Sequence, residues 1–253
     1  MIESTFVFLK GIGLTTERRL WSEGVLTWTD FIGTDRIQGL SLARKQLCDV
    51  EVRLAQDHHR RDDARYFAKC LKSRDHWRLY EWLRTRAVYL DIETTANFEI
   101  SVVGLFANGR MTSLVRGESL TAARLNEELS QYDLIVTFNG ATFDLPCLRA
   151  HFPNLSFDQP HMDLCLLGRQ LGLRGGLKRV EELLGIERPQ AIVGMDGWDA
   201  VRLWNRWRQS RDATAHALLL AYNEADCRNL EPLADLLYCR LSRQHDPFDR
   251  AGL

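Results

Sequence analysis

The spacing of apolar and polar residues changes character at residue 87. In residues 1–86 apolar side chains recur at helical intervals. This spacing predicts two amphipathic helices, over residues 40–54 and 66–83. The charged stretch 56–65 between them is predicted to be a solvated turn or a helix end. An earlier helix is expected to begin at Thr15 or Thr16, whose hydroxyls are good N-caps.

From residue 87 onward, short β-rich runs alternate with helical ones. The predicted strands cover residues 87–94, 98–106, 111–115 and 134–138. Asn108-Gly109 is a strong hairpin signal between the second and third strands. A helix is expected over 120–129, and from residue 142 onward the pattern turns helical and stays so. This order predicts an α/β fold, with a mixed sheet flanked by helices and a small N-terminal helical region.

Length and charge add a division into two parts. A chain of 253 residues permits one large domain, or a domain with a smaller appendage, and we predict a helical region over 1–86 and a second domain over 87–253. The net charge of −1 excludes a simple basic coat for nucleic acid. Residues 1–86 hold 16 basic and 12 acidic residues, whereas the remainder holds 17 and 22. That asymmetry fits a basic region that binds nucleic acid, joined to an acidic region that holds a metal site. A difference this small also arises by chance.

The six cysteines and the apolar runs exclude other classes. The cysteines are scattered without a Cys-x-x-Cys pair, which argues against a zinc site and against a disulfide framework. No run approaches 18 apolar residues, and residues 1–15 lack the pattern of a signal peptide. We therefore expect no membrane span and a cytoplasmic protein, and the oligomeric state stays open.

The sharpest chemical feature is the pair Asp91 and Glu93 in the first predicted strand. Residues two apart on a strand point to the same face, so both carboxylates project together while Leu90 and Ile92 enter the core. Two adjacent carboxylates repel each other unless a cation neutralises them. A divalent ion that prefers oxygen, such as Mg²⁺ or Mn²⁺, is the natural partner. A half-exposed strand with incidental acids is the alternative.

Two later acids complete a candidate set. Asp144 follows an apolar strand and lies in the first turn of the next predicted helix, where the helix dipole tolerates its charge. Tyr222 and Asp226 are four residues apart on a late helix and therefore share a face. Taken alone, Asp144 fits an ordinary helix-start acid, and Tyr222 fits a core residue beside an exposed Asp226.

The three motifs, in this order, resemble the DEDD superfamily of nucleases. They are Asp-x-Glu at Asp91, Asn-x-x-x-Phe-Asp at Asn139 and Tyr-x-x-x-Asp at Tyr222. The position of Tyr222, four residues before the last aspartate, resembles the pattern of the Tyr-bearing subgroup. Over roughly residues 86–240 the chain also resembles YprB-type ribonuclease-H-like domains, and the stretch from Phe8 to Gly13 (Phe-x-x-Gly-Ile-Gly) resembles the segment preceding them.

The resemblance implies a 3′→5′ exonuclease that releases 5′-mononucleotides from single-stranded DNA or RNA by a two-metal mechanism. It places two Mg²⁺ or Mn²⁺ ions on Asp91, Glu93, Asp144 and Asp226. Asp91 would bridge both ions, and Asp144 would act on the second through water. The Tyr222 hydroxyl would orient the attacking water or help take its proton.

Further residues are candidates for substrate contacts. Asn139 and Phe143 match family positions near the terminal nucleotide, and Phe143 could stack on a base. Thr94 and Thr95 follow the acidic pair and could touch the substrate backbone. An ordinary strand end for Thr94 and core packing for Phe143 are the alternatives. Asp163 resembles a further acidic family position, although a helix-start acid is favoured there.

Basic, glycine and tryptophan residues offer weaker signals. A group around Gly175-Gly176 could hold phosphates or form a solvated helix face; it comprises Arg169, Arg174, Lys178, Arg179 and Arg188. Gly11-Ile12-Gly13 resembles the hairpin of helix-hairpin-helix modules, which bind phosphates through backbone N–H groups. Most of Trp198, Trp204 and Trp207 are expected in the core.

The sequence leaves two other functions open beside the exonuclease. One is a catalytically weak nucleic-acid-binding module of a repair or polymerase assembly. A complete acid set argues against it, because a degenerate site usually loses a carboxylate. The other is a phosphatase with an Asp-x-Asp nucleophile, which the glutamate at position 93 disfavours.

Overall fold

The computed structural model describes residues 1–247, which fold into two compact units. The first contains residues 1–84, 158–160 and 238–247. The second contains residues 85–157 and 161–237. The division into a helical region over 1–86 and a second domain over 87–253 stays a prediction.

The first unit is built from short helices. They are α1 (Leu14–Ser22), α2 (Trp28–Gly33), α3 (Leu42–Arg60), α4 (Ala64–Cys70) and α5 (Tyr80–Leu83). The expected N-cap at Thr15 or Thr16 is wrong, because Gly13 holds that position. The single helix expected over 66–83 is also wrong. α4 ends at Cys70 and Leu71 is extended, so a 3-10 segment over Ser73–Leu79 separates α4 from α5.

A buried ion pair organises the interior of this unit. The Glu17 and Arg78 side chains are fully buried and lie 2.9 Å apart. Glu17 also accepts hydrogen bonds from the Thr5 hydroxyl at 2.6 Å and the Phe6 N–H at 2.7 Å. These bonds are needed, because a buried carboxylate without partners is strongly destabilising.

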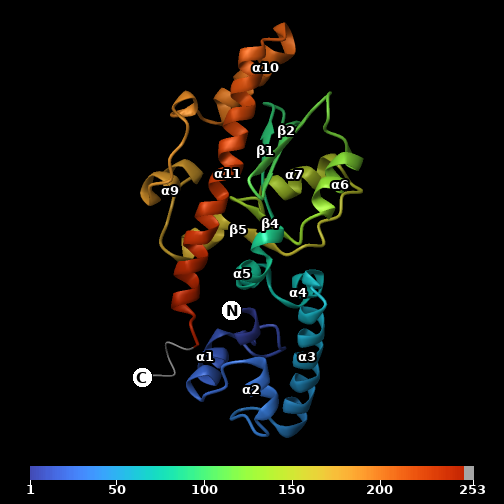
Figure 1. The fold of residues 1–253 in the computed structure, drawn as a ribbon, viewed down its shortest axis with the longest axis vertical. Coiled ribbons are helices and arrows are strands. Elements are labelled where there is room, and N and C mark those ends of the chain that lie inside the picture. The colour runs from blue at the N-terminus through green and yellow to red at the C-terminus, as the bar shows by residue number, and fades with distance from the viewer. Residues whose placement is uncertain (248–253) are drawn as a thin grey trace. The chain divides into compact units, whose positions relative to one another are not determined.

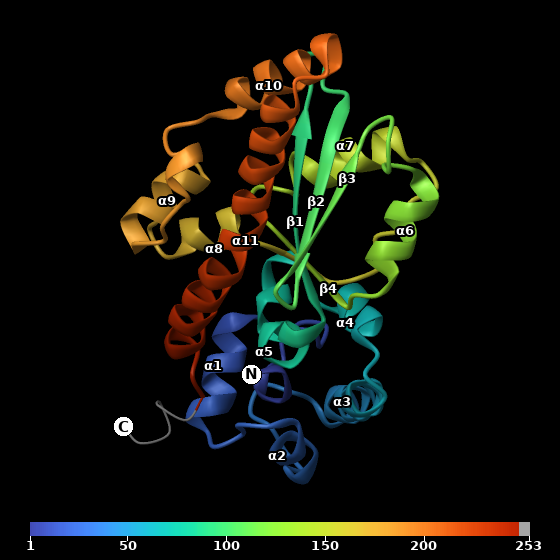
Figure 2. The same ribbon diagram turned by 45° about the horizontal axis from the view of Figure 1, so that its top comes forward.

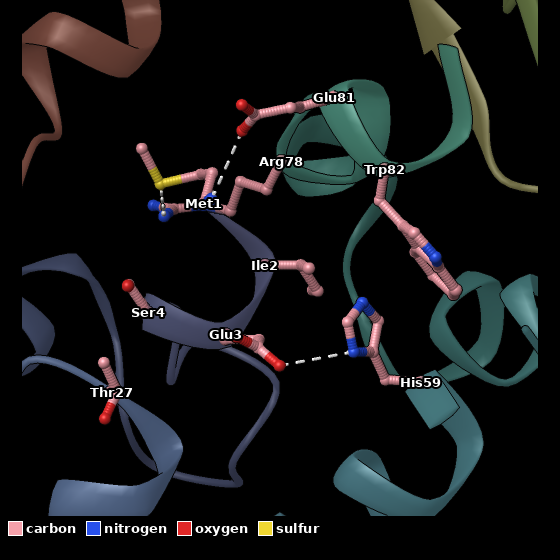
Figure 3. Close-up of a pocket in the computed structure, with 9 residues that line it drawn as sticks. All are labelled: Met1, Ile2, Glu3, Ser4, Thr27, His59, Arg78, Glu81 and Trp82. Atoms are coloured by element: carbon pink, nitrogen blue, oxygen red, sulfur yellow. Dashed lines mark hydrogen bonds and ion pairs between the residues drawn. The ribbon is translucent and has the colours of Figure 1, made fainter. Parts of the chain in front are cut away.

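The first unit also contains a pocket of about 370 Å³. Figure 3 shows the side chains around it, with Glu3 turned toward His59 and Glu81 toward the amino group of Met1. None of the acidic motif residues lines this pocket. The candidate chemistry therefore lies elsewhere, in the second unit.

The second unit is built on a mixed five-stranded sheet in the order β3-β2-β1-β4-β5. The strands are β1 (Ala87–Thr94), β2 (Ile100–Ala107), β3 (Arg110–Val115), β4 (Leu134–Thr137) and β5 (His161–Asp163). β1 pairs antiparallel with β2 and parallel with β4. The predicted hairpin is confirmed, because Asn108 and Gly109 both have positive φ and join β2 to β3.

Helices cover both faces of this sheet (Figures 1 and 2). They are α6 (Ala122–Ser130), α7 (Asp144–His151), α8 (Leu164–Gln170), α9 (Leu177–Leu184), α10 (Gly197–Ser210) and α11 (Ala213–Gln244). On one face Leu90 and Ile92 pack with α6 and α7. On the other face Val102 packs with α10 and α11. The expected α/β fold with a mixed sheet flanked by helices is confirmed.

One strand was missed in the sequence. Residues after 142 were expected to stay helical, yet β5 lies among them and extends the sheet beside β4. Three residues are too few to display a period of two, so the strand is visible only through its pairing. Within residues 1–247, no helix has the length and apolar character needed to span a membrane.

Candidate metal centre

β1 brings the first two acids together. The strand places Leu90 and Ile92 in the core and turns Asp91 and Glu93 toward the opposite face, as the alternation predicted. Asp91 pairs with Gly104 of β2, and the register shifts between Glu93 and Thr94. Such a bulge lies where a strand must re-aim its side chains.

α11 brings the third acid to the same place. The ligand oxygens of Asp91, Glu93 and Asp226 all lie within 4.8 Å of one another. Glu93 and Asp226 are buried, with Asp226 only 7% exposed, whereas Asp91 is partly exposed. The three carboxylates therefore meet in a largely buried setting.

A glycine lets α11 approach β2 closely enough to form the cluster. A Cβ atom at Gly104 would lie 2.2 Å from Asn223 Oδ1 and 2.6 Å from Cys227 Sγ. Asn223 uses this closeness to donate a 2.9 Å hydrogen bond from Nδ2 to Asp91 Oδ2. The helix that carries Asp226 thus also fixes the carboxylate of Asp91.

Asp144 lies beside the cluster and is held by the backbone. Its side chain is 3% exposed, and Oδ1 accepts a 3.1 Å hydrogen bond from the Ile92 N–H. Asp144 is not one of the three residues whose oxygens meet within 4.8 Å. It therefore borders Asp91 and Glu93 through the backbone between them.

Burial and mutual repulsion oppose ionisation of these acids. Burial raises the pKa of Asp91 well above its usual value, and the charges of Asp226 and Asp144 raise it further. Burial and the charge of Asp226 also raise the pKa of Glu93. Burial also raises the pKa of Asp144, to about 7. Ionising all of these carboxyls together is therefore unfavourable unless a cation lies among them.

Two cationic side chains partly offset that charge. Lys178 of α9 donates a 2.7 Å hydrogen bond from Nζ to Tyr222 Oη, and its charge lowers the pKa of Glu93. Arg188 donates a 2.5 Å hydrogen bond from Nη2 to Asp226 Oδ1. Burial raises the pKa of Asp226, although the charge of Arg188 and its hydrogen bond act in the opposite direction.

The predicted substrate residues separate into accessible and structural ones. Phe143 is 37% exposed immediately before α7, and Thr94 lines a pocket next to Glu93. Asn139 has a left-handed backbone with φ 68°, a conformation that asparagine tolerates. Its Oδ1 accepts a 2.9 Å hydrogen bond from the Thr142 hydroxyl, so the side chain stabilises the loop between β4 and α7.

Asp163 is a structural acid, in agreement with the favoured expectation. Its carboxylate caps α8 and also accepts hydrogen bonds from the N–H groups of Asn139 at 2.9 Å and Ala141 at 3.0 Å. It thereby ties β5 to the loop before Asp144, which sequence spacing did not indicate.

Sequence reasoning missed an aromatic pocket next to Glu93. The pocket measures about 280 Å³ and is lined by Thr94, Thr95, Ala96, Phe98, Asp196, Gly197, Trp198 and Val201. Phe98 is 67% exposed and Trp198 63% exposed. Of the three tryptophans expected mostly in the core, only Trp204 is buried; Trp207 is partly buried and Trp198 is not a core residue. The signal available in the sequence was the position of Trp198 in the first turn of a helix beside polar residues.

The donor set of the cluster fits a hard divalent cation. The available ligand atoms are carboxylate oxygens, which Mg²⁺ and Mn²⁺ prefer, and the three residues of the cluster include neither cysteine nor histidine. Burial and the neighbouring acids raise the pKa of Asp91 and of Glu93, and a cation among these carboxylates would offset that repulsion. The residues present therefore fit metal binding.

The fold and the cluster together define a ribonuclease-H-like α/β domain with an acidic centre. A family model described as RNase_H superfamily matches residues 88–238, which is more than half of the chain. The chain therefore belongs to the ribonuclease H superfamily. Membership indicates a nuclease or nucleic-acid-binding activity. The comparison with curated proteins found no match to the chain.

Proposed function

We propose that this protein is a metal-dependent 3′→5′ exonuclease of the Tyr-bearing DEDD group, with a YprB-type domain. It would hydrolyse the terminal phosphodiester bond of single-stranded DNA or RNA and release 5′-mononucleotides. The observation that carries the proposal is the meeting of Asp91, Glu93 and Asp226 oxygens within 4.8 Å. Tyr222 lies one helical turn before Asp226 on the same helix, which supports the Tyr-bearing assignment.

The proposed ligands divide between two positions. Asp91, Glu93 and Asp226 would hold one ion, with Asp91 shared and Asp144 serving the second position through water. Divalent ions bound there would lower the pKa of the attacking water and stabilise the leaving 3′-oxygen. The charges of both Asp226 and Asp144 raise the pKa of Asp91, which supports a position for Asp91 between the two sets of ligands.

Tyr222 is the proposed residue for the attacking water. Its Oη accepts the hydrogen bond from Lys178 Nζ, so the phenolic hydrogen is free to donate elsewhere. Burial raises the pKa of Tyr222 above its ordinary value, which keeps the phenol protonated at neutral pH. The hydroxyl would therefore orient the water as a neutral donor, while the nearby carboxylates accept the proton.

The aromatic pocket next to Glu93 suits nucleobases near the 3′ end. Exposed Phe98 and Trp198 offer faces on which bases stack without regard to sequence. Thr94 lines this pocket and directly follows Glu93 in β1. Phe143 at the start of α7 is a second stacking candidate.

The test is metal-dependent degradation of labelled ends. Single-stranded DNA and RNA carrying a 5′ label are incubated with the protein and Mn²⁺, with and without a chelator. Stepwise shortening from the 3′ end that stops with the chelator supports the proposal. Asp91→Asn and Asp226→Asn should each abolish shortening, whereas Asp35→Asn, at an exposed acid of the first unit, should leave it unchanged.

The other outcomes are equally informative. Shortening from the opposite end would contradict the proposed polarity. Tight binding of an unchanged substrate would favour a nucleic-acid-binding module with little turnover. Activity that survives both substitutions would show that the acidic centre is not the site of hydrolysis.

A further inference from the structure

Arg188 occupies one oxygen of a proposed metal ligand. Its Nη2 atom lies 2.5 Å from Asp226 Oδ1 and 2.8 Å from Glu181 Oε1. Nη2 carries two hydrogens, so these two bonds use both of them. The guanidinium therefore binds the same carboxylate that contributes to the acidic cluster.

Glu181 holds this guanidinium firmly in place. Its Oε2 accepts a second hydrogen bond, at 2.5 Å, from Arg188 Nε, which completes a bidentate pair. Asn229 of α11 donates a 2.9 Å hydrogen bond to Glu181 Oε1. The Glu181 side chain is 2% exposed and that of Arg188 is 8% exposed, so solvent does not loosen the pair.

The position of Arg188 has a direct electrostatic consequence. A cation that binds Asp226 must either share Oδ1 with a fixed guanidinium or use Oδ2 alone. In both cases it approaches a positive charge in a buried setting, where screening is weak. Arg188 Nη1 is also buried and has no hydrogen-bond partner among residues 1–247, so the guanidinium is not fully saturated by the fold.

We propose that Arg188 is a built-in counter-ion that competes with the first divalent ion for Asp226 and thereby sets the metal affinity of the site. Glu181 moderates this competition, because its negative charge offsets part of the guanidinium charge beside Asp226. The inference rests on the proposed function, since it assumes that the acidic cluster binds a divalent ion. It predicts that the two partners of one ion pair have opposite effects on metal binding.

The experiment measures Mn²⁺ binding to the full chain without nucleic acid, from the electron paramagnetic resonance signal of free Mn²⁺. Arg188→Gln should lower the dissociation constant on the order of tenfold, because a charge a few ångströms from a divalent ion is strongly repulsive even at an effective dielectric constant of about 20. Glu181→Gln should raise the dissociation constant by a similar factor, because it removes the negative charge that offsets the guanidinium beside Asp226.

Glu182→Gln is the matched control. Glu182 is the next residue of α9 and pairs with Arg179 on the surface, where both side chains are more than half exposed. Its substitution should change the dissociation constant by less than about twofold, as expected for an exposed pair. Circular dichroism in the presence of chelator establishes that each variant is folded.

A purely structural role for the pair gives a different result, because both substitutions would then weaken Mn²⁺ binding. That result, or two unchanged constants beside a wild type that binds Mn²⁺, overturns the inference and leaves the proposed function standing. If Arg188→Gln does not fold, Glu181→Gln alone decides, since unchanged or tighter binding contradicts the competition. If the wild type binds no Mn²⁺, both the inference and the proposed function fall.

Discussion

Replacing Asp144 with asparagine should stabilise the metal-free protein at alkaline pH. Burial raises the pKa of this carboxyl from 3.8 to about 7 in the folded state. The asparagine keeps an oxygen for the hydrogen bond from the Ile92 N–H, so it removes the charge and retains the contact. The substitution therefore isolates the cost of ionising a buried acid.

The sign of the effect depends on which state binds the proton. Between pH 4 and pH 7 the folded protein keeps the Asp144 proton that the unfolded chain releases. The free energy of unfolding therefore falls as pH rises through this window, and the loss is complete above the folded pKa. A difference of about three pKa units corresponds to a loss of about 4 kcal/mol at most. Asp144→Asn should recover much of this at pH 8 and little near pH 4.

Urea unfolding followed by circular dichroism measures this difference. Wild type and Asp144→Asn are compared in chelator at pH 4.5 and pH 8. Asp163→Asn is the contrasting variant, because the Asp163 carboxylate accepts hydrogen bonds from the Asn139 N–H in the loop before α7 and from the Cys165 N–H in α8. It should lower the free energy of unfolding at both pH values, by about 1–3 kcal/mol.

Two results would refute the reasoning about Asp144. The first is an Asp144→Asn variant less stable than wild type at pH 8, which would mean that its charge is favourable in the fold. The second is an equal difference at both pH values, which would assign the effect to packing. Mn²⁺ should also raise the melting temperature of wild type more at pH 8 than at pH 6, because ionised carboxylates bind the ion.

Three further substitutions test separate parts of the site. Tyr222→Phe should lower kcat on the order of 10²-fold with little change in KM, as expected for a group that acts on the water; equal losses in kcat and binding would contradict that role. Trp198→Ala should raise KM for single-stranded substrate roughly tenfold, because base stacking contributes about 1–3 kcal/mol. An unchanged KM would show that the aromatic pocket does not bind the substrate bases. Gly104→Ala should lower the free energy of unfolding by about 1–3 kcal/mol, since its Cβ would lie 2.2 Å from Asn223 Oδ1. If Gly104→Ala is as stable as wild type in urea, α11 can shift away from β2 at little cost, and the close approach does not require glycine.

Local features of the chain could be predicted because they depend on neighbouring residues. Alternation along β1 determines that Asp91 and Glu93 share a face, and this holds wherever the strand packs. The positive φ values at Asn108 and Gly109 are properties of that dipeptide in a tight turn. The spacing of Tyr222 and Asp226 likewise places both on one face of α11.

Other features of the site depend on residues that are far apart in the chain. Asn223 reaches Asp91 across 132 positions, and the closeness requires a glycine at position 104 on a different strand. Arg188 was grouped with solvated or phosphate-binding basic residues, yet it pairs inside the protein with Asp226, 38 positions away. The period of a helix predicts which residues share a face, but it does not predict which residues pack against that face.

The sequence by itself determined the acids, their order and the element that carries each of them. Only the tertiary structure decided that Asp226 joins Asp91 and Glu93 within 4.8 Å, and that Arg188 is already bound there. The reason is physical. Backbone geometry and side-chain periodicity act over a few residues, whereas the cost of burying a charge depends on every group that packing brings beside it.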